Sequence, residues 1–498
     1  MLFPKLEAGS ARAKWEKRPI HLILKCEKSF ANKAHYVFST LCKVIGLQII
    51  RAEDHQVSYN HPVIWYGPPS ELPEPKRGLI SIHASPTAPG FYKGKRAIKS
   101  EQLSFASWGD KSIPFLFDPE VGNLDNLDMP GSMGVEMPYD IVASAYYFLS
   151  RWEETVISER DEHGRFPYRE SVEAKLNLPE NVVDIYLDLF LALLDGVHQG
   201  APIEIPNWDG GAPFVACLTH DVDEIRMSLL KRLKFAWRHL FNPESGHREV
   251  PVHRRARLAA ANLFSTEDPL WTFPALAKLE QERGFTATYN FLAEGRRGQR
   301  HYSLTDPHVQ KFIADLRRFG FEIGLHGSYE SGFDEEKFNQ EKNLLAKLTG
   351  SEPIGHRQHY LRLEYALTLP IYERAGLQYD ATLAYAEHEG YRNQFSYPYH
   401  PYNHSADRPF RFLELPTVIM DATLAGYREL SADEAWQIIE TKLRQTLVRR
   451  GCITLLWHNP WEGESPGYFK LYPRMLNWIR EHGGQGLSGR DVLQQWVG

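Results

Sequence analysis

The chain has 498 residues, more than one ordinary hydrophobic core accommodates, so two or three domains would be typical of this length. Hydrophobic residues make up 43% and charged residues 24%, which is the balance of a folded protein in water. The formal net charge of −6 argues against a general nucleic-acid partner, because such binding needs a basic surface.

The N-terminal segment, the length of the apolar runs and the cysteines bear on where in the cell the protein is found. The N-terminal MLFPKLEAGSARAKWEKRPI lacks the apolar core and cleavage site of a secretory leader, and no segment reaches the roughly 18 uninterrupted apolar residues of a membrane span. We therefore expect a cytoplasmic protein without a transmembrane segment. Cys217 and Cys452 lie inside apolar runs, so we expect them to be buried free thiols.

Residues 1–205 are predicted to form a separate, smaller α/β domain. Short apolar runs predict its strands, and longer periodic stretches, the first with Asp140 as N-cap, predict its helices. The strands are expected at 21–26, 63–67 and 78–84, and the helices at 139–154 and 181–197. Residues 200–213 are rich in Gly and Pro and place the domain boundary there.

Residues 206–498 show short apolar strands alternating with helical patterns, which is typical of βα units around a parallel sheet. The seven strand candidates are PFVACLTHD, FTATYNFL, FEIGLHG, IGHRQHYL, LQYDATLAY, FLELPTVIM and CITLLWHN. Helices are expected among others at 308–320, 334–350 and 432–451. The fold class is therefore α/β, with a distorted (β/α) barrel of about seven strands, closed or nearly so.

Five of these strands end in residues that can titrate or bind a metal, as catalytic groups do in such barrels. The clusters are Thr219-His220-Asp221-Val222-Asp223, His326-Gly327-Ser328, Arg357-Gln358-His359, Asp380-Ala381-Thr382 and Trp457-His458-Asn459.

The Asp-Val-Asp of Asp221 and Asp223 carries the most chemistry. Residues two apart on a strand point to the same face, and two close carboxylates repel unless a cation or a proton lies between them. One can bind a divalent metal while the other accepts a proton from metal-bound water. The alternative is a pair of aspartates that cap a turn or a helix N-terminus, which is a common pattern after a buried strand.

The other clusters supply matching groups. His326 is a candidate zinc ligand, although a lone histidine is more often structural. His458 is a candidate general acid toward a leaving amine. Arg357 could fix a buried carboxylate such as Asp221 by a bidentate bond, or pair with a helix C-terminus.

The region of about 213–490 resembles the polysaccharide deacetylase family (NodB homology, carbohydrate esterase family 4). The family's opening Asp motif and its "ATFF" strand are matched by THDVD at 219–223 and TATYNF at 286–291. Its "GHEIGNHT" strand is matched by GFEIGLHGS at 320–328. Its Arg motif, Asp strand and Leu-x-x-His are matched by HRQHY at 356–360, LQYDATL at 377–383 and Leu455-Leu456-Trp457-His458.

This resemblance implies a role for each matching residue. Asp221 would be the catalytic base, Asp223 and His326 metal ligands, Arg357 the residue that orients the base, and His458 the catalytic acid. The implied reaction is attack of metal-activated water on an N-acetyl carbonyl, with a divalent metal, foremost zinc and otherwise cobalt or nickel.

The third ligand departs from the family pattern. The family has a second histidine four residues after the first, where this chain has Glu330. Glu330 could ligate through oxygen, but we favour His359, which closes another strand beside Arg357 and offers an imidazole. If neither residue ligates, the barrel would be a non-catalytic carbohydrate-binding remnant.

A divergent bacterial branch of the same family resembles nearly the whole chain. It carries HDVD, RQHYLR and WHN behind an N-terminal domain of unknown function with LSRWEE and DEHGRF, found here at 149–154 and 161–166. The resemblance implies a role near bacterial surface-polysaccharide biosynthesis and a carbohydrate substrate.

Residues 224–258 form a basic stretch with nine Lys or Arg against three Glu. Its amphipathic part, 229–241, could touch an anionic lipid surface or a charged glycan. A helix that packs its apolar face on the barrel is the favoured interpretation.

The segment from Tyr385 to His404 is rich in Tyr and His. Its rings could stack on sugar faces, and packing of a long ordered loop explains them almost as well.

Three functions fit these patterns. The first is hydrolysis of an N-acyl group on an amino sugar, in a glycan or in its nucleotide- or lipid-linked precursor. The second is hydrolysis of a small non-sugar amide. The third is non-catalytic binding within a polysaccharide assembly.

Overall fold

The computed structural model describes residues 19–53, 57, 62–125, 134–198, 202–227, 229–241, 251–264, 268–293, 302–459 and 467–497. Its N-terminal part contains a five-stranded parallel sheet of order β2-β1-β3-β4-β7. These strands are β1 (Ile20–Leu24), β2 (Ile49–Arg51), β3 (Val63–Gly67), β4 (Leu79–His83) and β7 (Val135–Met137). The three strands expected from the sequence are thus confirmed as β1, β3 and β4.

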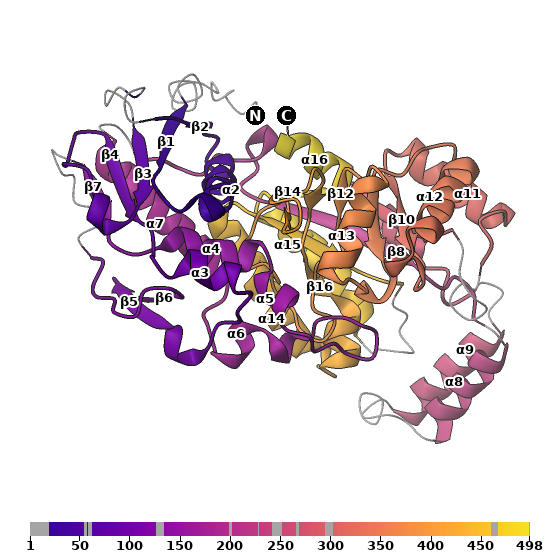
Figure 1. The fold of residues 1–498 in the computed structure, drawn as a ribbon. Helices are drawn as coiled ribbons and strands as arrows, with labels where there is room; N and C mark the ends of the chain where they lie inside the picture. The colour runs from indigo at the N-terminus through magenta and orange to yellow at the C-terminus, as the bar shows by residue number, and fades with distance from the viewer. Residues whose placement is uncertain are drawn as a thin grey trace, which may run out of the picture.

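Helices α2 (Lys28–Val44) and α7 (Val182–Val197) contact strands of this sheet, and an antiparallel pair, β5 (Ser104–Trp108) and β6 (Lys111–Phe115), lies beside it (Figure 1). The other helices of this part are α3 (Ala88–Lys93), α4 (Ile141–Leu149), α5 (Trp152–Val156) and α6 (Val172–Lys175). Asp140 caps α4 as expected, since its side chain accepts a hydrogen bond from the Ala143 amide.

The helix expected over 139–154 is two helices, α4 and α5. Arg151 lies between them in the left-handed conformation, with φ 48°. That backbone turns the Arg151 side chain into the protein interior, where it is 1% exposed. A buried charged group, rather than a glycine or proline, therefore marks this break, and the apolar period continues across it.

The C-terminal part is a curled parallel sheet of order β15-β12-β11-β10-β9-β8-β17-β16, with β18 also paired to β8. Its strands are β8 (Val215–Val222), β9 (Thr288–Leu292), β10 (Glu322–Gly327), β11 (Gly355–Gln358), β12 (Tyr379–Asp380), β15 (Leu413–Glu414), β16 (Thr417–Met420), β17 (Cys452–Leu456) and β18 (Gln485–Leu487).

The two ends of this sheet belong to one stretch of chain. β15 pairs with β12 at one end and β16 pairs with β17 at the other, and only Leu415 and Pro416 separate β15 from β16. The expected strand 412–420 is therefore split, because Pro416 has no N–H for a ladder. β18 is too short to give a sequence period and was not expected, so the sheet has nine strands where about seven were predicted.

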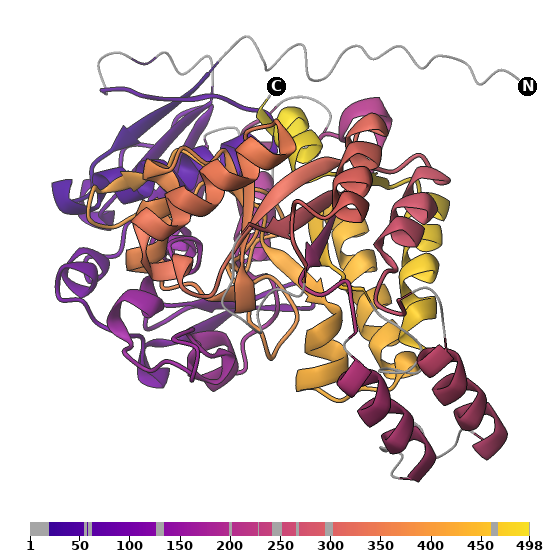
Figure 2. The ribbon, with the colours of Figure 1, turned by 90° about the vertical axis from the view of Figure 1, so that its right-hand side faces the viewer.

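Helices surround this sheet and follow the expected positions closely (Figures 1 and 2). Those over 308–320, 334–350 and 432–451 are confirmed as α11 (Pro307–Arg318), α12 (Glu335–Thr349) and α14 (Ala432–Arg449). The remaining ones are α10 (Phe273–Gln281), α13 (Tyr365–Arg374), α15 (Leu471–Glu481) and α16 (Gly489–Val497). Cys217 and Cys452 are buried free thiols, as expected.

The helix pair α8 (Leu229–Phe241) and α9 (Val252–Phe264) stands apart from the body of the molecule. Figures 1 and 2 show the two helices side by side, projecting away from the sheet and its helices. The expectation that the basic stretch packs its apolar face on the barrel is wrong, since Leu230, Trp237 and Phe241 are 79%, 57% and 74% exposed. Residues 242–250 of that stretch lie outside the described residues.

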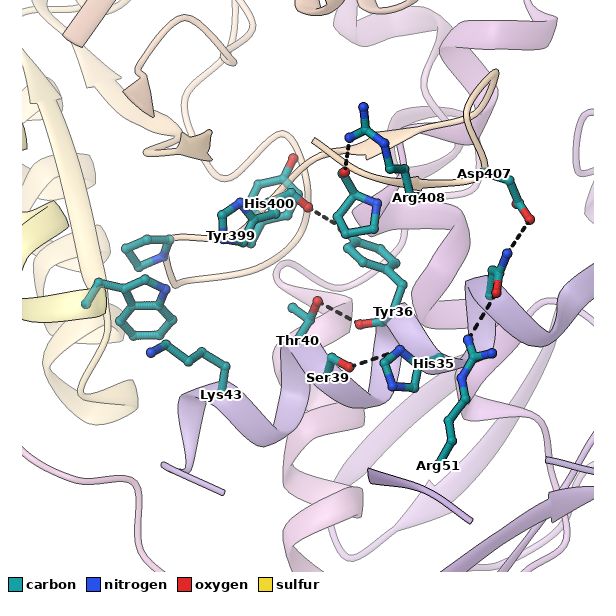
Figure 3. A pocket seen from close by; sticks show the side chains of 14 residues that line it. His35, Tyr36, Ser39, Thr40, Lys43, Arg51, Tyr399, His400, Asp407 and Arg408 are labelled. Carbon is teal, nitrogen blue, oxygen red and sulfur yellow. Dashed lines mark hydrogen bonds between the residues drawn. The ribbon is translucent and has the colours of Figure 1, made fainter. Parts of the chain in front are cut away.

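The two parts of the chain share one continuous core of buried side chains. A pocket of about 360 Å³ lies where α2 meets the segment from Pro398 to Pro409 (Figure 3). Two contacts join α2 to this segment beside the pocket: the Tyr36 hydroxyl donates to the His400 carbonyl (2.8 Å), and Lys33 forms an ion pair with Asp407. None of the helices in the described residues combines the length and apolarity that crossing a bilayer takes.

A buried ionic network joins the two parts more deeply. Glu154 of α5 accepts hydrogen bonds from Arg151 (2.7 Å) and from Arg392 (2.9 and 2.6 Å) of the loop after β12. All three side chains are at most 1% exposed. Arg151 also donates to the Tyr385 hydroxyl (2.7 Å), so side chains of the N-terminal part bind this loop at two points.

The tyrosines of the segment 385–404 are interior residues. Tyr385, Tyr391, Tyr397, Tyr399 and Tyr402 are at most 4% exposed. Of the two interpretations of this segment, the packing one is therefore correct for these rings, which are not available to stack on a sugar.

Candidate metal centre and active site

The site is built at the carboxyl ends of neighbouring strands. Asp221 lies on β8, and Asp223 follows its last residue. His326 lies on β10 and pairs in register with Arg357 on β11, and His359 follows β11 directly. Because parallel strands end at the same edge of a sheet, these side chains meet there.

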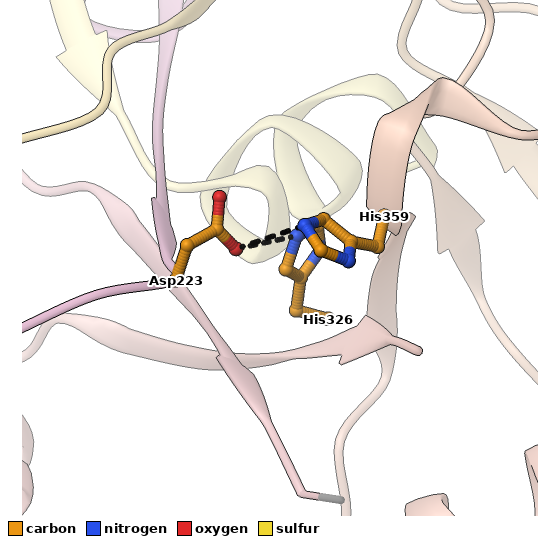
Figure 4. Close-up of side chains that lie close together, drawn as sticks. All are labelled: Asp223, His326 and His359. Atoms are coloured by element: carbon orange, nitrogen blue, oxygen red, sulfur yellow. Dashed lines mark ion pairs between the residues drawn. The ribbon is translucent and has the colours of Figure 1, made fainter. Parts of the chain in front are cut away.

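Asp223, His326 and His359 form a group whose ligand atoms all lie within 4.8 Å of one another, close enough to hold one metal ion. The Asp223 Oδ1 atom is 3.1 Å from His326 Nε2 and 3.6 Å from His359 Nε2 (Figure 4). One carboxylate and two imidazoles are a donor set that suits zinc and its neighbours in the first transition series.

The hydrogen bonding of the group also fits a metal. Asp223 Oδ1 and His326 Nε2 are both buried and have no hydrogen-bond partner in the described residues. His326 Nδ1 donates to the Arg357 carbonyl (2.9 Å), which leaves the lone pair on Nε2, the atom that faces Asp223. A backbone acceptor behind a metal-binding imidazole is the usual way to fix the ring and its tautomer.

The electrostatics of the group follow from burial and opposite charges. Burial raises the pKa of Asp223, but His359 and His326 lower it more, so the net pKa lies well below its usual range. Burial lowers the pKa of His359 to about 4, so this imidazole is neutral and able to ligate near pH 7.

Asp221 is buried beside this group. Its Oδ1 atom accepts a hydrogen bond from Asn290 (2.9 Å) and lies 3.3 Å from Arg357 Nη1, and its Oδ2 atom is 3.7 Å from His326 Nε2. Burial raises the pKa of Asp221, but His326 and Arg357 lower it more, so the carboxylate is charged.

Of the two partners considered for Arg357, the structure shows Asp221, but through one hydrogen bond and not a bidentate pair. Besides its single long contact with Asp221, Arg357 donates to the hydroxyls of Thr219 (2.6 Å) and Thr417 (2.7 Å) and to the Ala381 carbonyl (2.8 Å). The guanidinium thus spans the ends of several strands, and Asp221 is one of four acceptors.

His458 faces the group from the end of β17, with Nε2 3.8 Å from Asp223 Oδ2. Asp421, just after β16, accepts from the His458 amide (2.9 Å) and from its Nδ1 (2.6 Å). Burial lowers the pKa of His458, but Asp421 raises it more, to about 10, so the imidazole carries a proton near neutral pH.

Sequence reasoning missed Asp421 and Asn290. Asp421 directly follows an expected strand, so the rule that singled out the other strand ends would have found it. Asn290 lies within the run TYNFL, and only the pairing of Asp221 with Asn290 across β8 and β9 brings it to the site.

Three other candidates lie elsewhere. Asp380 accepts from His356 Nδ1 (2.8 Å), and this pair, both 0% exposed, belongs to the interior of the sheet. His220 points to the opposite face, where it contacts Glu280 (2.7 Å). Glu330 is half-buried at the start of a 3₁₀ turn and is not part of the metal-competent group in the described residues.

Comparisons with known proteins give limited likeness. Residues 22–199, less than half of the chain, match a family described as a family of unknown function (DUF7033). Among curated proteins, none matches this sequence.

Solved structures resemble the chain in part. A protein of Mycobacterium smegmatis described as a polysaccharide deacetylase is 16% identical, with a TM-score of 0.39 over 58% of this chain and 92% of that one. A protein of Pseudomonas aeruginosa PAO1, also described as a polysaccharide deacetylase, is 16% identical, with a TM-score of 0.39 over 60% of this chain and 96% of that one. The PuuE allantoinase is 16% identical, with a TM-score of 0.40 over 60% and 95%. Likeness at this level leaves the function to be argued from the chain's own residues.

Proposed function

We propose that this protein is a metal-dependent hydrolase that removes an N-acyl group, foremost N-acetyl, from an amino sugar of a bacterial surface glycan or its precursor. The observation that carries the proposal is the convergence of Asp223, His326 and His359 beside Asp221 and His458. Within the described residues, the buried Asp223 Oδ1 and His326 Nε2 atoms face each other without a hydrogen-bond partner. The six ordered motifs that resemble those of polysaccharide deacetylases support the choice of an acylated amino sugar.

Asp223, His326 and His359 are the proposed metal ligands, and zinc, cobalt or nickel suits their donor set. A divalent ion held there would supply a water of lowered pKa and polarise the acyl carbonyl.

The remaining groups supply proton transfer. Asp221, charged and held in place by Asn290, would take a proton from the attacking water. His458, kept protonated and oriented by Asp421, would give a proton to the leaving amine.

The deciding experiment measures acetate release by the full chain after loading with Zn²⁺, Co²⁺ or Ni²⁺. Chitooligosaccharides and UDP-N-acetylamino sugars are compared with simple acetamides, and a chelator-treated sample is the blank. Release from the sugars alone supports the proposal. Release from simple amides alone would favour the small-amide hydrolase, and a chain that takes up no stoichiometric metal would favour a non-catalytic binding protein.

The identity of the third ligand can be tested by metal affinity. We expect His359→Ala to weaken Zn²⁺ binding by at least about 100-fold, beyond the 10- to 100-fold typical of losing a hydrogen-bond partner behind a ligand. Glu330→Gln, the matched control, should bind Zn²⁺ like the parent chain. Competition titration with a chromogenic chelator measures both, and the opposite ranking of the two variants would make Glu330 the ligand.

The role of Asp421 can be tested separately from metal binding. We expect Asp421→Asn to lower kcat by about 10²- to 10⁴-fold, the range of general acid catalysis, because His458 loses the carboxylate that keeps it protonated and aligned. Zn²⁺ affinity should be retained. A parallel loss of Zn²⁺ in Asp421→Asn would show that Asp421 supports the metal instead.

A further inference from the structure

The helix pair α8 and α9 presents an apolar face to the surroundings. On α8 the residues Leu229, Leu230, Leu233, Trp237, Leu240 and Phe241 are exposed by 67%, 79%, 49%, 57%, 37% and 74%. They recur at steps of three and four residues, so they form a single stripe along the helix. Within the part of the chain that the structure describes, this stripe is exposed, and the helix pair that carries it projects from the body (Figures 1 and 2).

The charge around the stripe has one sign. The sequence of α8 contains four Lys or Arg and that of α9 three, and neither contains an Asp or Glu. Lys234, beside the stripe on α8, is exposed, as is Arg257 on α9. The basic charge is therefore local, because the whole chain has a formal net charge of −6.

We infer that the α8–α9 pair docks on the surface of a membrane that contains anionic lipids. A helix with exposed Leu, Trp and Phe on one side and Lys and Arg around them lies in the interface of such a membrane, with its rings among the acyl chains and its cations at the headgroups. A polyanion such as a nucleic acid would use the cations but leave the apolar stripe in water. A second copy of the chain would bring an equally basic face against this one.

The base of the pair is fixed to the body, so docking would orient the protein. The Asp268 carboxylate accepts hydrogen bonds from the Met227 amide (2.9 Å) and from Arg232 (2.9 Å), which joins the two chain ends of the pair. Asn459 donates to the carbonyls of Glu224 (2.8 Å) and Leu270 (2.7 Å), again one on each side.

These anchors lie next to the candidate active site. Asn459 follows His458, and Leu229 comes six residues after Asp223, a span of at most about 20 Å. Docking would thus bring the strand ends near the lipid surface. An amino sugar carried on a lipid would be presented from that surface, and this consequence rests on the proposed function, whereas lipid binding does not.

The test is co-sedimentation of the full chain with vesicles of phosphatidylcholine and phosphatidylglycerol (3:1) and of phosphatidylcholine alone. We expect binding to the mixed vesicles that weakens as salt is added, and little to the neutral ones. The triple variant Leu230→Gln/Trp237→Gln/Phe241→Gln should lower the partition coefficient at least tenfold, and so should Lys234→Glu/Arg257→Glu.

The control variant Leu367→Gln/Val448→Gln changes two exposed apolar residues of the body, 61% and 81% exposed, and should bind vesicles like the parent chain. Zn²⁺ binding and the unfolding midpoint, unchanged in each variant, would show that the fold is kept. A parent chain that does not bind the mixed vesicles would overturn the inference. A dimer in sedimentation that only the triple variant dissociates, without vesicle binding, would overturn it in favour of a second copy.

Discussion

Asp221→Asn is expected to lower kcat by about 10²- to 10⁴-fold while Zn²⁺ affinity stays close to that of the parent chain. The amide has the shape of the carboxylate and can still face Asn290 and Arg357, but it cannot accept the proton of the attacking water. Acetate release under saturating substrate measures the loss, and a chelator titration measures the metal.

The matched control for this change is Asp334→Asn. Asp334 caps α12 by accepting from the Lys337 amide (3.0 Å), and asparagine is an equally good cap, so turnover should not change. Asp223→Ala completes the comparison, because it should lose turnover and Zn²⁺ together. An active Asp221→Asn enzyme would remove Asp221 from the role of base, whatever the metal does.

The position of the site could be predicted from the sequence because parallel strands all deliver their carboxyl ends to one edge of a sheet. Because Asp221, His326 and Arg357 lie near the carboxyl ends of parallel strands, their side chains are expected at the same edge of the sheet. His359 is expected there as well, since it directly follows β11. The same logic applied to Asp421, which directly follows a strand, and it would have supplied the partner of His458.

What could not be predicted depends on contacts between residues far apart in the chain. The Arg357 guanidinium donates hydrogen bonds to Thr219, Thr417 and other acceptors. These acceptors are far from Arg357 in the chain, so no local sequence pattern predicts them. Asp380 ends a strand in the sequence like the site residues, yet its side chain pairs with His356 on the neighbouring strand and lies in the interior. A strand-end position therefore indicates where a side chain lies, whereas its neighbours decide what it does.

The amphipathic period of α8 shows the same limit. The pattern correctly predicted a helix with one apolar face, but it carries no information on what that face touches. A face of this kind most often packs on the rest of the fold. Here the helix is inserted between β8 and β9 and packs on α9 instead, which leaves the stripe exposed.

Glu154→Gln is expected to destabilise the folded chain by about 3–5 kcal/mol, the cost of breaking a buried ion pair by removing one partner. Glu154 is the acceptor for both Arg151 and Arg392, and burial leaves water no access to either guanidinium. Glutamine keeps the size of the side chain but removes the negative charge. Less negative charge then faces the two buried guanidinium groups. The urea midpoint of unfolding, followed by circular dichroism, measures the change.

The control is Glu335→Gln, which breaks the exposed pair with Arg374 (2.8 Å) and should leave the midpoint nearly unchanged, because solvent screens such pairs. The two substitutions are chemically identical, so their difference isolates burial. The network also joins α5 to the loop after β12, which implies that residues 1–205 are needed for that loop to hold its conformation. Equal midpoints for the two variants would mean that the arginines find other acceptors and that the network does not hold the two parts of the chain together.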